Sequence, residues 1–241
     1  MEYGKQLTEL VKLIADEREE GRVLLILQEA VKVMQGEAAV FCSFVSGDEG
    51  TESYRFLVAC SPVWCSVYQE QNWFTSDPAL IYAATRSEPI RGSQLPIRTR
   101  AQRELVDSGA HHGFVAGAVF PAPSGGGISR IGALILGSSD PKYLQGEDFF
   151  AAKMYGRLLS MELNEWWIRK IRHDMIATSN LTEDDITLLA FEKRGMKSKE
   201  IARELDTTAS SIDSRFQRLN AKLHSGSRAE SARIAVEHGV I

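Results

Sequence analysis

The apolar residues of the first third of the chain change from a helical repeat to an alternating one. Residues 1–36 carry two apolar stripes at three- to four-residue spacing, which predicts helix. Residues 39–45 and 54–60 alternate instead, and turn-forming residues separate them at 46–51, so a β-hairpin is the simple interpretation. The pattern then predicts a helical region at about 64–86, a loop at 88–96 and a charged helix near 99–110.

The middle of the chain repeats the change from strand to helix. Residues 114–120 and 128–136 are further strand candidates, joined by 121–127 with its three glycines. No Lys-Ser or Lys-Thr pair follows these glycines and no helix begins there, which favours a hairpin loop over a phosphate loop. A long helix is predicted over 147–173. The pattern of the first 170 residues therefore predicts one sheet covered by helices.

Helical periodicity fades after the long helix and returns with a different spacing. We interpret the small polar residues before Leu181 as a linker. The predicted organisation is an N-terminal domain at 1–173, a linker at 174–180 and a C-terminal domain at 181–241. The C-terminal domain has no strand signal, and its capping and apolar residues predict four short helices. These helices begin near Thr182, Ser198, Ala209 and Arg228.

The third of these helices, at about 209–223, has two distinct faces. The apolar face holds Ile212, Phe216, Leu219 and Leu223, and the opposite face is small and polar with one arginine. Two short helices joined by a tight turn, the second with a polar outer face, are typical of a helix-turn-helix that enters the major groove. A solvated helical bundle is the alternative. The candidate DNA-contacting residues are Lys199, Ser210, Ser211, Ser214, Arg215, Gln217, Arg218 and Lys222.

The overall composition argues against nucleic-acid binding until it is divided by domain. The 241 residues include 28 basic and 32 acidic ones, a net charge of −4. Residues 181–241 hold ten of each, so the deficit lies in the N-terminal part. Within the neutral C-terminal domain, residues 187–203 carry five basic residues against two acidic ones. Such local clusters can contact phosphates.

Other features bear on compartment and chemistry. No stretch approaches the roughly 18–20 uncharged apolar residues of a membrane span, and no secretory signal is visible at the start. Three cysteines are too sparse for a disulfide framework, which favours a reducing compartment, so we expect a cytoplasmic protein. Because no membrane span is predicted, we expect no membrane partner. Scattered histidines and the absence of a nucleophile elbow argue against a metal site, a cofactor and enzymatic activity.

The C-terminal domain resembles the DNA-binding domain of LuxR-type transcription regulators, in register and without a gap. The residues that carry the resemblance are Leu181, Thr182, Leu189, 195–202, Leu205, Ile212, Lys222 and Leu223. The sequence departs from the family at four positions. Thr187 stands where Glu is usual, Met196 where Lys is usual, Lys197 where Ser or Thr is usual, and Arg215 where His is often found. None of these is a core position, so the departures bear on DNA affinity or site preference.

The N-terminal domain is similar to the autoinducer-binding domain of the quorum-sensing members of that family. The aromatic and Asp-Pro string runs from Trp64 through Tyr68 and Trp73 to Asp77, and Gly117 matches a strand glycine. The resemblance implies an α/β/α sandwich around an antiparallel sheet. The expected fold class is therefore α+β, with a four-helix helix-turn-helix domain at the C-terminus.

The resembling residues suit the chemistry of an acyl-homoserine lactone, which has an amide N–H, two carbonyls and an apolar tail. The resemblance implies that Asp77 accepts the amide N–H and that the Trp64 indole donates to the lactone carbonyl. Tyr68 and Trp73 would supply aromatic walls, and Gly117 would leave room for the head group. The alternatives are core packing for the three aromatic residues and a helix cap for Asp77.

Three departures from the family fall on the pocket. Gly92 stands where most relatives have an aromatic residue that packs on the lactone. Cys60 stands where the family often has a tyrosine that bonds the acyl carbonyl, and Leu136 lies near the position of a common Ser or Thr. We expect a wider and less polar pocket that takes a bulkier or longer-tailed signal, or a molecule without a lactone. A domain that folds without ligand is the other hypothesis.

The resemblance also implies partners. We expect a homodimer that binds a small-molecule autoinducer and a palindromic promoter, with RNA polymerase as a further candidate partner. The long helix with Met154, Leu158 and Met161 is the expected dimer contributor, although packing on its own sheet is equally consistent. Activation is the usual behaviour of the family, and repression stays open. The alternative is a LuxR-type antagonist or ligand-independent protein that acts through heterodimers and binds little DNA itself.

Overall fold

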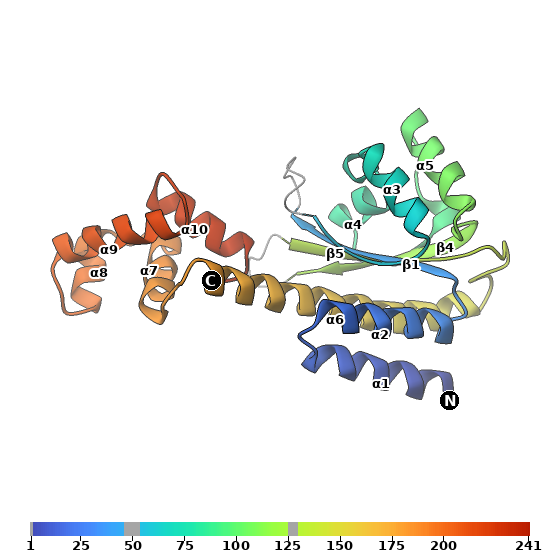
Figure 1. The fold of residues 1–241 in the computed structure, drawn as a ribbon, viewed down its shortest axis with the longest axis horizontal. Helices are drawn as coiled ribbons and strands as arrows, with labels where there is room; N and C mark the ends of the chain where they lie inside the picture. The colour runs from blue at the N-terminus through green and yellow to red at the C-terminus, as the bar shows by residue number, and fades with distance from the viewer. Residues whose placement is uncertain (1, 46–53, 125–129) are drawn as a thin grey trace. The chain divides into compact units, whose positions relative to one another are not determined.

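The chain forms two compact units. The computed structural model describes residues 2–45, 54–124 and 130–241. An N-terminal unit extends to Trp167 and contains the sheet, and a C-terminal unit begins at Ile168 and is helical where it is described (Figure 1). Among the described residues, no helix combines the length and the apolar character needed to cross a membrane.

The N-terminal unit is built on a five-stranded antiparallel sheet with the order β2-β1-β5-β4-β3. Its strands are β1 (Ala38–Val45), β2 (Arg55–Ala59), β3 (Ile90–Arg91), β4 (Ala116–Pro123) and β5 (Arg130–Ser138). The four predicted strands are confirmed, and β1 pairs with β2 as the hairpin pattern predicted, with Phe41 opposite Leu57. Residues 46–51 and 125–127 of the two predicted turns lie outside the described residues. The short β3 was missed, because a two-residue strand inside 88–96 has no alternation to detect.

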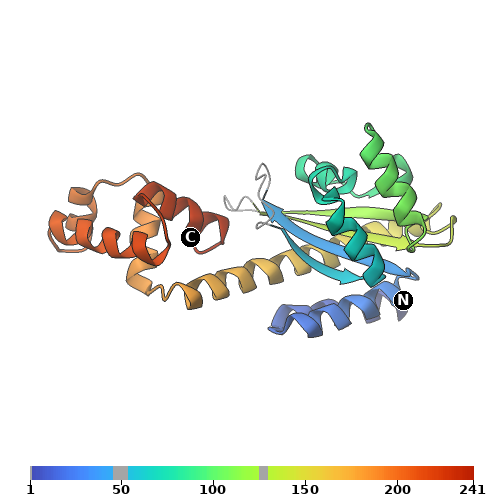
Figure 2. The same ribbon diagram turned by 45° about the horizontal axis from the view of Figure 1, so that its top comes forward.

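Helices cover both faces of this sheet. They are α1 (Glu2–Asp16), α2 (Glu20–Val33), α3 (Pro62–Glu70), α4 (Pro78–Thr85), α5 (Arg100–Ala110) and α6 (Asp148–Thr178), with 3₁₀ turns η2 (Trp73–Thr75) and η3 (Gly92–Gln94). The helices α3, α4 and α5 lie on one face, and α1, α2 and the first part of α6 lie on the other (Figures 1 and 2). The mixed α/β architecture expected for residues 1–173 is therefore present.

The helical region predicted at 64–86 is divided into three pieces. Asn72 adopts a left-handed conformation with φ of 51°, which ends α3, and Pro78 begins α4 one residue after its cap. Apolar spacing continues through both interruptions, which explains why periodicity alone predicts one helix. The break matters because it places Asp77 at the start of α4, on the face of the sheet that α3, α4 and α5 cover.

The long helix packs on the opposite face of the sheet through small and polar groups. The Ser160 hydroxyl donates to the Phe120 carbonyl over 2.7 Å, and Asn164 Nδ2 donates to the Ala122 carbonyl. Gly156 lies against the Phe120 ring, where a side chain would collide with it. These contacts fix α6 on β4 and leave the other side of the helix facing outward.

The segment expected as a linker at 174–180 is helical as far as Thr178. The N-terminal domain was expected to end at His173, but α6 continues, and its end belongs to the C-terminal unit. Met175 and Ile176 pack against the core of that unit. The sequence pattern faded because the buried face of the helix changes partner there. The helix stops before Asn180, whose φ of 48° is left-handed.

The C-terminal unit contains the four predicted helices. They are α7 (Glu183–Lys193), α8 (Ser198–Glu204), α9 (Ala209–Lys222) and α10 (Arg228–Glu237). Thr182 and Asp185 form a reciprocal capping box, as the sequence indicated. The predicted apolar face of α9 is buried, with Ile212, Phe216 and Leu219 almost inaccessible to solvent.

Candidate ligand pocket and surface of the helical unit

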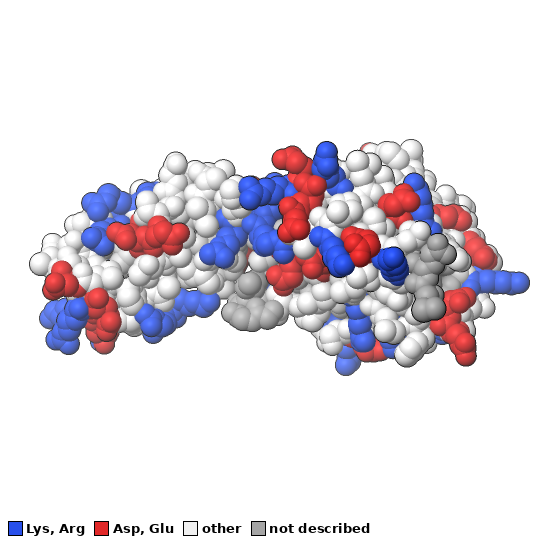
Figure 3. Space-filling model, turned by 90° about the horizontal axis from the view of Figure 1, so that it is seen from below, with Lys and Arg blue, Asp and Glu red and all other residues white. Residues whose placement is uncertain are grey.

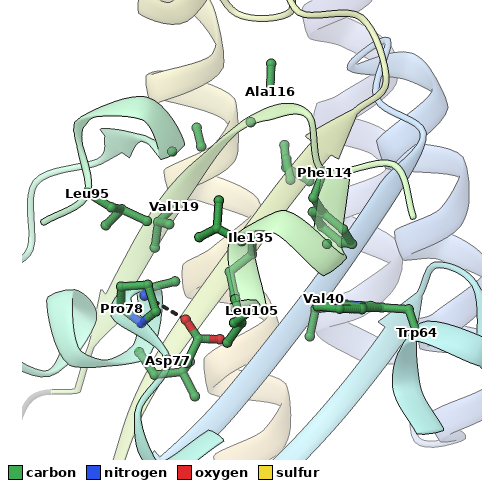
Figure 4. Close-up of a pocket in the computed structure, with 18 of the residues that line it drawn as sticks. Val40, Trp64, Asp77, Pro78, Leu95, Leu105, Phe114, Ala116, Val119 and Ile135 are labelled. Atoms are coloured by element: carbon green, nitrogen blue, oxygen red, sulfur yellow. Dashed lines mark hydrogen bonds between the residues drawn. The ribbon is translucent and has the colours of Figure 1, made fainter. Parts of the chain in front are cut away.

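A cavity of about 390 Å³ lies between the sheet and the helices α3, α4 and α5. This volume is near the lower end of the range for small-molecule sites. The strands β1, β2, β4 and β5 form one wall, with Val119 and Ile135 among its apolar side chains. Figure 4 shows Asp77, Trp64 and Phe114 reaching the pocket from separate segments of the chain. Of the eight residues predicted to bind ligand, six line this cavity: Trp64, Tyr68, Asp77, Gly92, Gly117 and Leu136.

Asp77 is the buried charged group of the pocket, with 4% of its surface exposed. One carboxylate oxygen accepts the backbone N–H of Ala79 over 2.7 Å, and the other accepts the Tyr68 hydroxyl over 2.8 Å. Burial raises the pKa of Asp77, and the hydrogen bonds from Tyr68, Ala79 and Leu80 oppose this rise. The residue therefore caps α4, as the structural alternative held, and also lines the pocket. A carboxylate has further lone pairs with which to accept a ligand N–H or O–H.

Trp64 is the centre of an aromatic cluster beside Asp77. Its ring centroid lies 5.9 Å from that of Tyr68, 5.6 Å from that of Trp73 and 5.6 Å from that of His112. No hydrogen bond among the described residues uses the indole N–H of Trp64, although the side chain is 6% exposed. This N–H is not one of the buried polar atoms without a partner, so it is accessible. A ligand carbonyl in the pocket would satisfy it.

Tyr68 lies in the pocket, and its hydroxyl group has a separate role. It forms part of the pocket wall, but its O–H is already used to hold the Asp77 carboxylate. Burial and the neighbouring Asp77 charge raise the pKa of Tyr68 well above its ordinary value. The hydroxyl therefore remains protonated and orients the carboxylate.

Two of the predicted ligand residues stand one layer behind the pocket. Trp73 and Cys60 do not line the cavity, and both pack against Trp64 instead. The cysteines that line the cavity are Cys42 and Cys65. Cys65 Sγ lies 3.9 Å from Cys60 Sγ, too far for a disulfide bond. The resemblance placed Cys60 at the pocket because its position in the family is polar. In this chain the small side chain lies behind the aromatic layer.

The two pocket glycines are constrained differently. A side chain at Gly117 would collide with the carbonyl of Leu136 on the neighbouring strand, so strand packing requires glycine there. The nearest atom to a Cβ at Gly92 is the Gly117 carbonyl oxygen at 3.6 Å, which is ordinary contact. Room for a ligand is therefore not the sole reason for glycine at position 117.

Apart from Gly92, sequence reasoning missed the exposed residues that complete the pocket opening. The exposed lining residues are Gln69, Gly92, Ser93, Val106, Val115, Pro141 and Gln145. The loop with Pro141 and Gln145 follows β5 and has no motif or repeat, so only the folded chain brings it to the pocket. No group of three or more His, Cys, Asp or Glu side chains in the described ranges could hold a metal ion.

The predicted DNA-contacting residues all lie on α8 and α9 of the C-terminal unit. Exposed side chains on these helices include Lys199, Ser210, Ser214, Gln217 and Arg218. Basic and acidic groups alternate on the visible face of this unit, without one continuous basic patch (Figure 3). The exposed polar face of α9 thus matches the face that the sequence indicated.

The remaining predicted DNA contacts are half-buried against other parts of the unit. Lys222 Nζ lies 2.6 Å from an Asp185 carboxylate oxygen and also donates to the Asn180 carbonyl. Burial alone would raise the pKa of Asp185, but hydrogen bonds from Lys222 and Thr182 bring it below its ordinary value. Arg215 lies 3.9 Å from the Asp184 carboxylate, and Ser211 is half-buried at the start of α9. Lys222 and Arg215 therefore hold α9 to the start of α7.

Comparison with known proteins identifies relatives of both the domain and the fold. The family described as the autoinducer binding domain matches residues 20–162. No curated protein sequence matches the chain. Among solved structures, SdiA of Escherichia coli has a TM-score of 0.72 at 15% identity, covering 100% of this chain and 99% of that one.

Two further solved structures share the fold. SdiA in complex with octanoyl-rac-glycerol has a TM-score of 0.73 at 14% identity, covering 99% of this chain and 96% of the other. CepR2 of Burkholderia cenocepacia, an N-acylhomoserine lactone dependent LuxR-family factor, has a TM-score of 0.59 at 12% identity. It covers 70% of this chain and 98% of its own length.

Proposed function

The chain belongs to the autoinducer-binding domain family, and from this premise we propose that it is a signal-responsive transcription regulator of the LuxR type. The domain of this family binds a small-molecule signal. The observation that carries the proposal is that the buried Asp77 carboxylate and the accessible Trp64 indole line one largely apolar cavity. A ligand with one N–H or O–H and one carbonyl complements these two groups.

The signal is an amphiphile of the acyl-homoserine lactone type or a variant of it. Support for a variant comes from Gly92 and Leu136, which line the cavity without the aromatic ring or hydroxyl usual in the family. The SdiA complex holds octanoyl-rac-glycerol, an acyl amphiphile without a lactone. Mass spectrometry of small molecules that purify with the protein would identify the class.

The C-terminal unit binds promoter DNA in this proposal, with α9 as the reading helix. Support comes from its exposed polar face and from the pair of short helices, α8 and α9, that precedes α10. The proposed contacts are Lys199, Ser210, Ser211, Ser214, Arg215, Gln217, Arg218 and Lys222. The pairing of Arg215 and Lys222 with α7 favours the alternative in one respect, because it leaves fewer cations for phosphate. A heterodimerising antagonist would bind no promoter fragment under any condition.

An Arg218→Ala variant should bind promoter DNA about 5- to 150-fold more weakly, because a base contact is worth roughly 1–3 kcal/mol. The measurement is a gel shift on genomic promoter fragments, with and without culture extract. Arg233→Ala is the matched control, since this arginine is an exposed cation of α10 that pairs with Glu237. Equal binding by the two variants would remove base reading from α9.

A homodimer is the proposed active form, and α6 supplies the surface. Phe150, Met154, Leu158 and Met161 recur on one face of this helix and are 70%, 60%, 43% and 38% exposed. In the described part of the chain this is a continuous apolar stripe, and such stripes mark protein interfaces. The side chains face away from the sheet, which favours association over the intramolecular packing that the sequence left open.

A Leu158→Glu variant should shift the dimer toward monomer by at least about 30-fold in dissociation constant, because a central interface residue is worth roughly 2 kcal/mol or more. Light scattering after size-exclusion chromatography over a range of concentrations measures this. Leu25→Glu is the control, because Leu25 is 63% exposed on a different helix. If Leu158→Glu and Leu25→Glu associate equally, α6 is not the interface.

A further inference from the structure

One part of the pocket wall consists of backbone without a side chain. Gly92 lines the cavity and is exposed to solvent, and only the Gly117 carbonyl group approaches the position of its missing Cβ within 4 Å. Ser93 and Gln145 are also exposed lining residues. The cavity therefore opens to solvent at Gly92.

This opening is held by specific contacts on both sides. Arg91 Nε donates to the Leu144 carbonyl over 3.0 Å, and an Arg91 Nη donates to the Gly146 carbonyl over 3.2 Å. The same guanidinium lies 4.5 Å from the centre of the Phe149 ring. On the other side, the Leu95 N–H closes a turn onto the Gly92 carbonyl. These bonds join the Gly92 segment to the 144–149 segment, so the opening is a built feature of the fold.

The residues that line the pocket differ in their access to water. Asp77 is buried, whereas Gly92, Ser93 and Gln145 face water. We propose that the natural ligand is an amphiphile that donates a hydrogen bond to Asp77 and carries a substituent that leaves the cavity through the opening at Gly92. This inference rests on the proposed function and specifies its ligand class.

The size of the cavity supports a partly enclosed ligand. At about 390 Å³ the cavity is near the lower limit for ligand sites, so a bulky ligand cannot be enclosed. The hydroxyl of Ser93 and the amide of Gln145 offer hydrogen bonds at the rim. A polar substituent at this end keeps both its hydration and these partners. The pocket thus selects for the buried end of the ligand and tolerates variation at the other.

The test uses the full chain and three probes. They are 1-octanoyl-rac-glycerol and two derivatives extended by a polyethylene glycol chain, one at the glycerol end and one at the terminal carbon of the acyl chain. Isothermal titration with wild type should show one extended probe binding within about threefold of the parent. A Gly92→Phe variant should lose about 30-fold or more for that probe, because the ring fills the exit. Gly92→Ala is the matched control and should retain it.

The outcomes separate this inference from the function on which it rests. Binding of the unextended probe to Gly92→Phe shows that the variant pocket is intact. If the parent binds wild type and both extended probes fail, the opening is not a ligand exit and the inference is wrong. The inference is also wrong if Gly92→Phe and Gly92→Ala bind the tolerated probe equally. If wild type binds none of the three, the acylglycerol form of the ligand and the inference built on it are wrong, while the gel shift with culture extract still tests the proposed function.

Discussion

An Asp77→Asn variant is expected to bind the signal about 10- to 100-fold more weakly than wild type, while its ligand-free form melts at a higher temperature. The loss follows because a hydrogen bond to a charged acceptor is worth roughly 1.5–3 kcal/mol. The gain follows because the buried carboxylate is costly in the empty pocket. Asparagine keeps the cap on the Ala79 N–H through its oxygen, and its amide nitrogen can donate to the Tyr68 oxygen where the carboxylate accepted.

The pH dependence of this difference has a definite sign. Burial raises the pKa of Asp77 above its ordinary value of 3.8, so the folded protein holds this proton more tightly than the unfolded chain does. The stability contributed by the protonated group is complete below that value and is lost as pH rises through the folded-state pKa. The melting-temperature advantage of Asp77→Asn should therefore grow upward from about pH 4 and then level off.

Calorimetric melts between about pH 4 and pH 8, with and without the co-purified signal, measure both effects. Asp107→Asn is the control, because Asp107 is exposed on α5 and does not line the pocket. A variant at position 77 that is stabilised by the signal as strongly as wild type would show that the carboxylate is not the anchor. In that case the helix cap would be its whole role.

The parts of the site that lie within one local pattern were predictable from sequence. Trp64, Tyr68 and Asp77 fall within 14 consecutive residues, and the structure brings all three to one cavity. Trp73 belongs to the same string but packs against Trp64 and does not line the cavity. Spacing fixes which residues are near each other, whereas the left-handed Asn72 decides which of them turns toward the pocket.

The parts that depend on distant segments were not predictable. Gln145 reaches the pocket because the Arg91 side chain bonds the backbone at 144 and 146, more than 50 residues away. Likewise, Lys222 looks like a phosphate contact in the sequence of its own helix. Its pairing with Asp185 depends on the packing of α9 against α7. Side-chain pairs between separate helices leave no periodic signal in either one.

The linker shows the same limit in the fold. Residues 174–180 lack an apolar repeat of their own, but Met175 and Ile176 find partners in the C-terminal core. Helix propagation through Asp174 is supported by its ion pair with Lys170 and by the Thr178 hydroxyl bonded to its carbonyl. Tertiary contacts thus extend a helix that local pattern would end.

A Gly117→Ala variant is expected to lose about 1–3 kcal/mol of stability even without ligand, since one added methyl group forces the strands apart. The new Cβ would collide with the Leu136 carbonyl oxygen and contact the backbone of Gly137 at 3.2 Å. Backbone atoms of a central strand cannot move aside as a flexible side chain can. At about 2–4 °C per kcal/mol for a unit of this size, the melting temperature should fall by about 2–12 °C.

Gly92→Ala is the matched variant, because it adds the same methyl group to the same cavity where the nearest atom is 3.6 Å away. Its melting temperature should stay within a degree or so of wild type or rise slightly, since alanine restricts the unfolded chain more than glycine does. Circular dichroism melts of both variants without added signal make the comparison. Equal stability of the two would mean that the sheet accommodates a side chain at position 117. The role of Gly117 would then be the one that the family resemblance implied, namely leaving room for the head group of the ligand.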